Sequence, residues 1–133
     1  MKVISVIEPW ASLIKEDIKN IETRSWKTNY RGKIYIHASL KKVSTKDERI
    51  NSLVNLLNNK EFKYGYIIAE ANLVDCIYMD ENFLTKIKEN KIEYLTGEYK
   101  IGRYAWILEN IKVLDNPIKA KGNLGIWNYN IDD

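Results

Sequence analysis

The segment "IKNIETRSWKTNYRGKIYIHAS", from Ile18 to Ser39, decides the expected fold of this chain. Its pattern predicts two short strands, at 19–26 and 33–39, joined by a loop. Glu22, Arg24 and Trp26 alternate along the first strand and therefore share one face, with Lys19 just before them. Charged side chains are costly at buried strand positions unless they are paired. The segment thus predicts a polar cluster close to the core.

The rest of the chain predicts a small α+β domain. A capping box is expected at the start of one helix, where Ser44 or Thr45 precedes Asp47 or Glu48 by three residues. Alternating and apolar patterns predict further strands at 1–7, 64–78, 102–114 and around 126–127, and helical patterns predict helices at 8–18, 44–59 and 80–90. We therefore expect one domain over residues 1–133, built on a mostly antiparallel sheet or small barrel of four to six strands with two or three helices.

Positive charge is concentrated in the first half of the chain. Residues 1–65 hold 13 Lys and Arg against 7 Asp and Glu, a net charge of +6, whereas residues 66–133 hold 8 against 11, a net charge of −3. Only four arginines occur, so Arg24 and Arg31 carry more information than the lysines around them. Aromatic residues lie between these basic residues, as a ligand with phosphates and bases requires. A solvated, lysine-rich surface would give the same composition.

The residue types exclude several kinds of site. The chain has no P-loop, no GxGxxG after a strand and no HExxH motif, so no cofactor is expected. One histidine and one cysteine cannot provide the N/S ligands of a zinc site, so no metal is expected either. No stretch approaches the roughly 18 apolar residues of a membrane helix, and the start of the chain does not resemble a signal peptide. Together with the absence of a disulfide framework, this predicts a cytoplasmic location.

Further polar residues lie on the predicted strands outside the first cluster. His37 and Ser39 lie two residues apart on one strand, so their side chains would be too far apart for a direct proton relay, and we do not expect a catalytic triad. A half-buried histidine is more often structural than catalytic. Glu70 interrupts an apolar strand and therefore needs a partner. We hypothesise that a basic residue of the first cluster pairs with Glu70 and that both lie in one pocket.

The cluster of Lys19, Glu22 and Arg24 supports three interpretations. A carboxylate between two cations is ionised and held by charge-assisted hydrogen bonds, and such a group can bind a base edge or a phosphate. Alternatively, a desolvated Lys19 acts as a general base. The third interpretation is an ion-pair network that only ties the strand to a neighbouring loop.

The motifs of this chain resemble those of the ASCH domain family over nearly its whole length. The family shows an I-x-x-P-W/Y-A start, a K-x-x-E-x-R segment often followed by W, then Y-R-G and a strand that ends in H-A-S. The matching residues here are Pro9, Trp10 and Ala11; Lys19, Glu22, Arg24 and Trp26; Tyr30, Arg31 and Gly32; and His37, Ala38 and Ser39. One departure is the turn before Lys19, where the family usually has a glycine and this chain has Asp17 or its neighbours.

The resemblance implies a PUA-like fold, a small curved β-barrel of about five to six strands with two to three helices around it and a cleft lined by the K-x-x-E-x-R segment. It also implies RNA or a modified nucleotide as the ligand. The residues expected to bind that ligand are Trp10, Lys19, Glu22, Arg24, Ser25, Trp26, Arg31, His37, Ser39 and Glu70.

Two alternative functions follow from the same resemblance. Some distant ASCH-like proteins remove the acetyl group from N4-acetylcytidine, and others are linked with ribonuclease activity, so a small hydrolase with Lys19 and Glu22 as catalytic groups is one alternative. In the amidohydrolases a threonine follows the lysine by three residues, whereas this chain has Glu22 there. The second alternative is a protein-interaction module in transcription or translation, for which the helix at Thr45–Asn58 offers only generic support.

Overall fold

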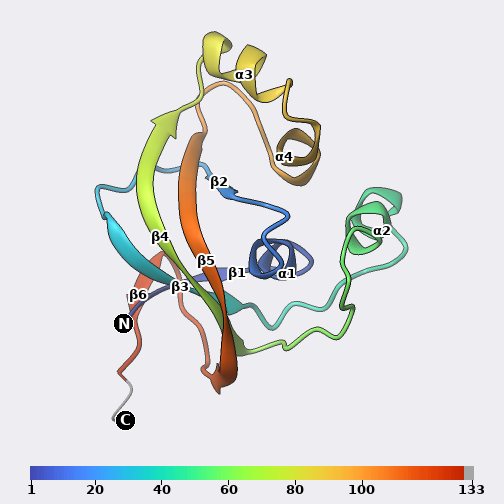
Figure 1. Ribbon diagram of the computed structural model, residues 1–133, viewed down its shortest axis with the longest axis vertical. Coiled ribbons are helices and arrows are strands. Elements are labelled where there is room, and N and C mark those ends of the chain that lie inside the picture. Colours follow the sequence, from blue (N-terminus) through green and yellow to red (C-terminus); the bar gives the residue numbers. More distant parts are fainter. Residues whose placement is uncertain (131–133) are drawn as a thin grey trace.

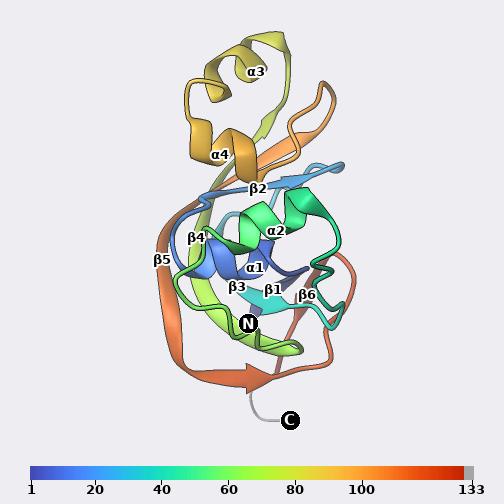
Figure 2. The same ribbon diagram turned by 90° about the vertical axis from the view of Figure 1, so that its right-hand side faces the viewer.

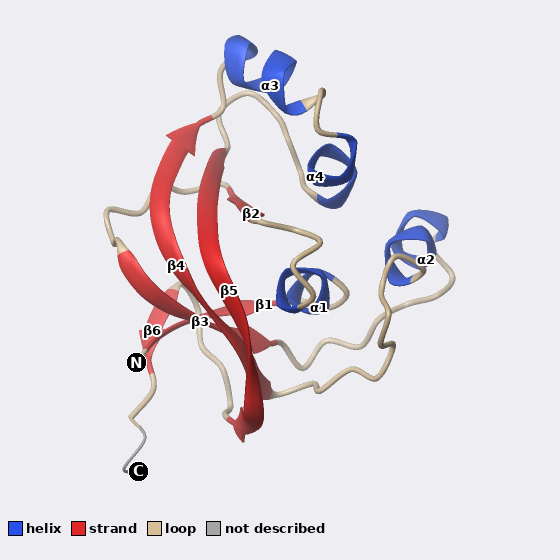
Figure 3. Cartoon of the chain, in the orientation of Figure 1, coloured by secondary structure: helices blue, strands red, loops and turns tan. Residues whose placement is uncertain are grey.

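The computed structural model describes residues 1–130 and shows one strongly curved, six-stranded sheet (Figures 1 and 3). The strand order is β2-β5-β4-β3-β1-β6. The strands are β1 (Lys2–Val6), β2 (Ile21–Arg24), β3 (Gly32–Ala38), β4 (Tyr66–Tyr78), β5 (Tyr104–Lys119) and β6 (Ile126–Asn128), and the helices are α1 (Trp10–Lys15), α2 (Glu48–Val54), α3 (Glu81–Ile87) and α4 (Lys91–Thr96).

All neighbouring strands are antiparallel except β1 and β3, which run parallel. The long strands β4 and β5 change register at three points along their pairing, and such irregularities bend a sheet. The sheet therefore curls into a half-barrel. This confirms the predicted α+β, PUA-like fold with a mostly antiparallel sheet, although residues 1–130 contain four helices and not two or three.

The apolar core lies on the concave side of the sheet, where α1 packs (Figures 1 and 2). Ile34 and Ile36 point into it from β3, and Trp106 enters it from β5 with no exposed surface. On its other side α1 carries Leu13, which packs against Leu53 and Leu57 in and after α2. The helix α1 therefore connects the sheet to α2.

Two helices, α2 and α4, differ from the predicted ones. The helix predicted at 44–59 begins only at Glu48, because Asp47 is its N-cap and accepts hydrogen bonds from the backbone N–H groups of Arg49 and Ile50. The helix α4 was not predicted at all. Asn90 caps it by accepting a hydrogen bond from the N–H of Glu93, and α3 and α4 together follow β4 (Figure 1).

The turn between α1 and β2 places the first residues of the site. Asp17 adopts a positive φ of 62°, a conformation that favours glycine, at the turn where the resembling family usually has one. The side chain of Asn20 donates a hydrogen bond to the carboxylate of Asp17. Lys19 follows this turn, and β2 then forms the edge of the sheet.

Candidate functional site

Two cavities adjoin one another at the open side of the half-barrel. The first has a volume of about 430 Å³ and the second about 410 Å³. Both are lined by Ser5 and Ile7, which lie in and after β1, and by Arg24 at the end of β2. The two cavities therefore share a boundary, and an extended ligand can contact both of them.

The centre of the first cavity is a hydrogen-bonded pair formed by Glu22 and Arg24. Arg24 donates from Nε to Glu22 Oε2 over 3.0 Å, and its Nη2 lies 2.9 Å from the same oxygen. Glu22 is buried, with only 7% of its surface exposed. The alternation of β2 puts both side chains on one face, as the sequence predicted. The carboxylate is therefore held in a fixed position by a charge-assisted hydrogen bond.

Two tryptophans border this pair. Trp26 packs edge-on against buried Trp106, with ring centroids 4.7 Å apart, and is still 37% exposed. Trp10 lies at the start of α1, and the guanidinium of Arg49 lies 5.7 Å from the centre of its ring. Both Trp10 and Trp26 line the first cavity, so each can offer part of an aromatic surface to a ligand.

Four further residues that line the first cavity were not predicted from the sequence: Thr23, Arg49, Glu98 and Arg103. Arg103 donates to the backbone oxygens of Glu98 and Thr23, and the backbone N–H of Glu98 donates to the hydroxyl of Thr23 over 3.2 Å. Arg49 reaches the cavity from α2, and no carboxylate within residues 1–130 lies within 4.0 Å of it. Arg24, Arg49 and Arg103 thus bring three guanidinium groups to one cavity.

Lys19 does not line the cleft, although the K-x-x-E-x-R segment predicts that it does. Its side chain is fully buried and does not line either cavity. Within the described residues its Nζ has no hydrogen-bond partner. Burial lowers the pKa of Lys19, and the carboxylates of Glu22 and Glu93 act in the opposite direction. The expectation that the whole K-x-x-E-x-R segment lines the cleft is therefore correct for Glu22 and Arg24 but wrong for Lys19, whose position before β2 turns it inward.

Glu93 is a buried acidic residue of this region that the sequence did not reveal. Its Oε1 accepts a hydrogen bond from the backbone N–H of Asn20. Its Oε2 has no hydrogen-bond partner in residues 1–130. Burial raises the pKa of Glu93, while the Asn20 hydrogen bond and Lys19 lower it. The helix α4 thus contributes a buried carboxylate whose charge acts on the buried amine of Lys19.

The second cavity contains a histidine network. His37 Nε2 lies 2.8 Å from the backbone oxygen of Ala120, and Nδ1 lies 3.0 Å from Ser5 Oγ. A carbonyl only accepts, so Nε2 carries the proton, and in the neutral ring Nδ1 accepts from the Ser5 hydroxyl. Trp127 Nε1 donates to the same hydroxyl over 3.1 Å. The serine that contacts His37 is thus Ser5, because β1 and β3 pair in parallel with these two residues in register.

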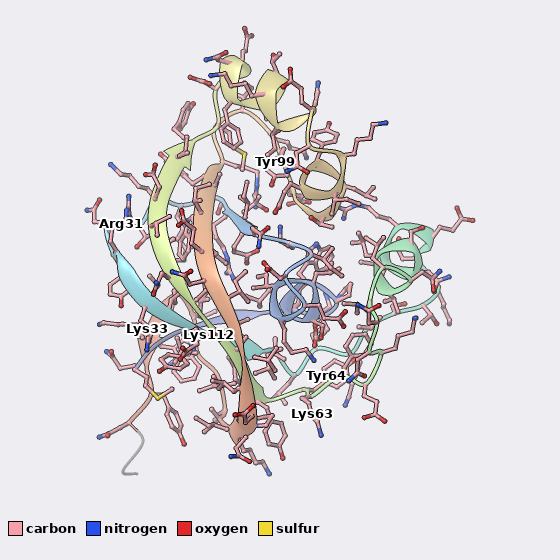
Figure 4. The ribbon with its side chains drawn as sticks, in the orientation of Figure 1. Arg31, Lys33, Lys63, Tyr64, Tyr99 and Lys112 are labelled. Carbon is pink, nitrogen blue, oxygen red and sulfur yellow. The ribbon has the colours of Figure 1, made fainter. Side chains whose placement is uncertain are left out.

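The other predicted binding residues lie in different places. Ser25 lines the first cavity, and Ser39 lines the second. Arg31 and Glu70 do not line either cavity. Arg31 pairs with Asp75 at 3.8 Å, and Glu70 pairs with Lys33 at 3.8 Å. Figure 4 shows Arg31 and Lys33 on the side of the sheet that faces away from α1. The hypothesis that Glu70 shares a pocket with the first cluster is therefore wrong, although a basic residue does pair with it.

Within residues 1–130, no group of three or more His, Cys, Asp or Glu side chains is arranged to hold a metal ion. Likewise, none of the helices in this range has the length and apolar character needed to cross a membrane. The arrangement found here instead combines a fixed carboxylate, guanidinium donors and exposed indole surface. Such groups can recognise a planar heterocycle that carries hydrogen-bonding edges.

Comparison with known proteins gives a consistent result. The family model described as "ASCH domain" matches residues 4–118. Human activating signal cointegrator 1 is 35% identical over 125 residues, which are 93% of this chain, and the mouse protein of the same name is 26% identical over the same length. The chain spans only 21% of the length of either relative.

Among solved structures, the ASCH protein from Zymomonas mobilis and a point mutant of it resemble this fold. Their TM-scores are 0.56 and 0.55, at 19% sequence identity. Each match covers 89% of this chain, and 72% and 74% of the respective structures. The family model covers most of the chain, and the human relative is 35% identical over nearly all of it. This chain therefore belongs to the ASCH domain family.

Proposed function

We propose that this protein binds RNA, or a modified nucleotide, in the cleft formed by the two cavities. The observation that supports this most directly is the fixed pair of Glu22 and Arg24 in a cavity bordered by Trp26. The family to which the chain belongs is related in general to RNA binding. RNA is read mainly through unstacked bases that stack on aromatic or guanidinium groups and form hydrogen bonds at their edges.

Each group has a distinct role in this proposal. The exposed part of Trp26 stacks on a base, because indole surface stacks on any base without sequence preference. Glu22 accepts a hydrogen bond from a base amino group, since an ionised carboxylate is only an acceptor. Arg49 and Arg103 attract phosphates to the cavity through their positive charge.

The test is a titration of fluorescent single-stranded RNA with purified protein at low and at moderate salt. We compare wild type with Trp26→Leu, which removes the stacking surface, and use Tyr94→Leu as the control because Tyr94 is a similarly exposed aromatic on α4 outside the cavities. We expect salt-dependent binding that is weakened only by Trp26→Leu. RNA that does not bind at either salt concentration would overturn the proposal.

A hydrolase acting on a modified nucleoside is a second candidate, supported by one observation. Burial lowers the pKa of Lys19, and its Nζ has no hydrogen-bond partner within residues 1–130; a desolvated amine of this kind can act as a general base. Against it, the amine does not reach either cavity. Incubation of the protein with N4-acetylcytidine, followed by chromatography, tests this candidate. Cytidine formed by wild type but not by Lys19→Met would support it, and RNA cleavage in the titration above would support a ribonuclease.

A further inference from the structure

The two cavities differ in the charges that line them. The first cavity contains the carboxylates of Glu22 and Glu98 beside its three arginines. The second cavity is lined by Arg24, His37 and Lys121, and by no carboxylate of the described chain. Within residues 1–130 Lys121 forms no ion pair. Lys121 therefore gives the second cavity an uncompensated positive charge, whereas the first cavity provides acceptors as well as donors.

A glycine loop forms the floor of the second cavity. This loop, residues 121–125, connects β5 to β6 and contributes all five of its residues to the lining. Gly122 has a φ of +86°, and a Cβ added there would lie 2.7 Å from His37 Cε1. Only glycine therefore allows the backbone to approach the ring so closely. The hydrogen bond from His37 to the backbone oxygen of Ala120 fixes the start of the loop. The contact of Ser5 with His37 in turn holds the histidine ring.

Arg24 lies at the boundary of both cavities and is already held on two sides. It donates to Glu22 in the first cavity and, through Nη2, to the backbone oxygen of Ser5 over 2.8 Å. Ser5 lines both cavities as well. A ligand that spans the boundary thus passes a rigidly positioned guanidinium, which is a group suited to phosphate oxygens.

We infer that the second cavity is an anion subsite that holds a phosphate attached to the nucleoside bound in the first cavity. This inference rests on the proposed function and makes it more specific. The ligand class is then a phosphorylated nucleoside, either a mononucleotide or a phosphodiester within RNA, and not a free nucleoside. Lys121 and Arg24 contact the phosphate, while Glu22 and Trp26 contact the base.

The experiment measures affinity by calorimetry for a matched set of probes. The set contains cytidine and adenosine, their 5′- and 3′-monophosphates, the dinucleoside monophosphates CpC and ApA, and inorganic phosphate alone. Wild type is compared with Lys121→Ala, which removes one cation from the exposed loop. Lys119→Ala is the control, because Lys119 is also exposed and lies two residues earlier, outside both cavities.

We expect at least one phosphorylated probe to bind about tenfold more tightly than its nucleoside, a difference typical of hydrogen bonds to a charged group. Lys121→Ala should remove most of this preference and leave nucleoside affinity unchanged, and Lys119→Ala should leave both unchanged. A preference for monophosphates over the dinucleoside monophosphate would indicate a terminal phosphate, and the reverse preference an internal phosphodiester. Either result supports the subsite.

Three other outcomes would overturn the inference, and they separate it from the proposed function. Equal affinity for nucleosides and nucleotides, in a protein that binds RNA, would remove the anion subsite and leave RNA binding intact. An equal loss for both probe types in Lys121→Ala would mean that the loop only shapes the cleft. If no phosphorylated probe binds and RNA does not bind either, both proposals fail together.

Discussion

Arg24 on β2 donates a hydrogen bond from Nη2 to the backbone oxygen of Ser5 on β1, over 2.8 Å. These strands are far apart in the sheet, because β2 forms one edge and β1 lies next to the other edge strand, β6. The same guanidinium holds Glu22. One side chain therefore joins the two ends of the half-barrel and also separates the two cavities, so fold and site depend on it together.

Replacing Arg24 by methionine should lower the free energy of unfolding by about 2 kcal/mol. The change removes the bond to Ser5 and leaves the carboxylate of Glu22, which is close to buried, without its cation. Urea denaturation at pH 7 measures this loss. The control is Lys33→Met, which removes the pair between the exposed amine of Lys33 and Glu70 at 3.8 Å and should cost less than about 0.5 kcal/mol. Equal losses in the two variants would show that Arg24 does not join the sheet edges.

The buried amine of Lys19 predicts a particular dependence of stability on pH. Its pKa in the folded protein lies below 10.5, the value for the free side chain. Between these two values the unfolded chain binds more protons than the folded protein, so the free energy of unfolding of wild type should rise as pH increases toward 10.5. Below the folded-state pKa the cost of burying the ammonium is present in full.

Lys19→Met should remove this rise, because methionine has a similar length and does not titrate. Urea denaturation at several pH values from 7 to 10 gives the two curves. Lys15→Met serves as the control, since Lys15 lies near Lys19 in the chain but is not buried. If the rise persists in Lys19→Met, another group is responsible and the amine is not the titrating site.

Glu93 predicts the opposite trend at lower pH. Burial raises its pKa above 4.5 in the folded protein, so the folded protein binds the extra proton between 4.5 and that raised value. Its contribution to stability is present below pH 4.5 and is lost as pH rises through the raised pKa. The slope of the free energy of unfolding against pH above 4.5 should therefore be less negative in Glu93→Gln than in wild type. Identical slopes, measured by urea denaturation, would contradict this, and Glu89→Gln on the neighbouring turn is the control.

Local rules predicted the parts of the site that depend on neighbours along the chain. Glu22 and Arg24 are two residues apart on a strand, and this spacing alone puts them on one face. Glu70 lies between Ala69 and Ala71, both of which are buried, so the same alternation could have placed it on the opposite face. The predicted shared pocket is wrong because residues 69 and 71 occupy the buried face of β4, which puts the carboxylate of Glu70 on the face where Lys33 lies.

Long-range pairing explains what the sequence could not show. The contact of Ser5 with His37 depends on the parallel register of β1 and β3, which no local pattern encodes. Glu93 on α4 accepts a hydrogen bond from the backbone N–H of Asn20, although the two residues are 73 positions apart in the chain. Arg49 and Arg103 enter the first cavity from α2 and from the segment before β5. Only the packing of those elements around β2 brings them together.

The salt dependence of RNA binding should show whether Arg49 or Arg31 contacts the phosphates of the RNA. For single-stranded nucleic acid, the logarithm of the binding constant falls linearly with the logarithm of the salt concentration, with a slope of about 0.7 per phosphate contact. Arg49→Ala should reduce the slope by about this amount, because Arg49 lines the first cavity and has no carboxylate near it in the described chain. Arg31→Ala should leave the slope unchanged, since Arg31 does not line either cavity. The reverse result would move the RNA site to the other face of the sheet.

The hydroxyl of Ser5 should contribute to stability independently of any ligand. It accepts from Trp127 Nε1 and contacts His37 Nδ1, so Ser5→Ala leaves a buried imidazole nitrogen and an indole N–H without partners. Such losses cost about 1–3 kcal/mol, measurable by urea denaturation. Ser52→Ala is the control, because the Ser52 hydroxyl donates only to the oxygen of Glu48 on an exposed helix face. A cost no larger in Ser5→Ala than in Ser52→Ala would mean that the network does not hold the 121–125 loop against β1. In that case the second cavity would lose its fixed floor, and the phosphate subsite its geometric basis.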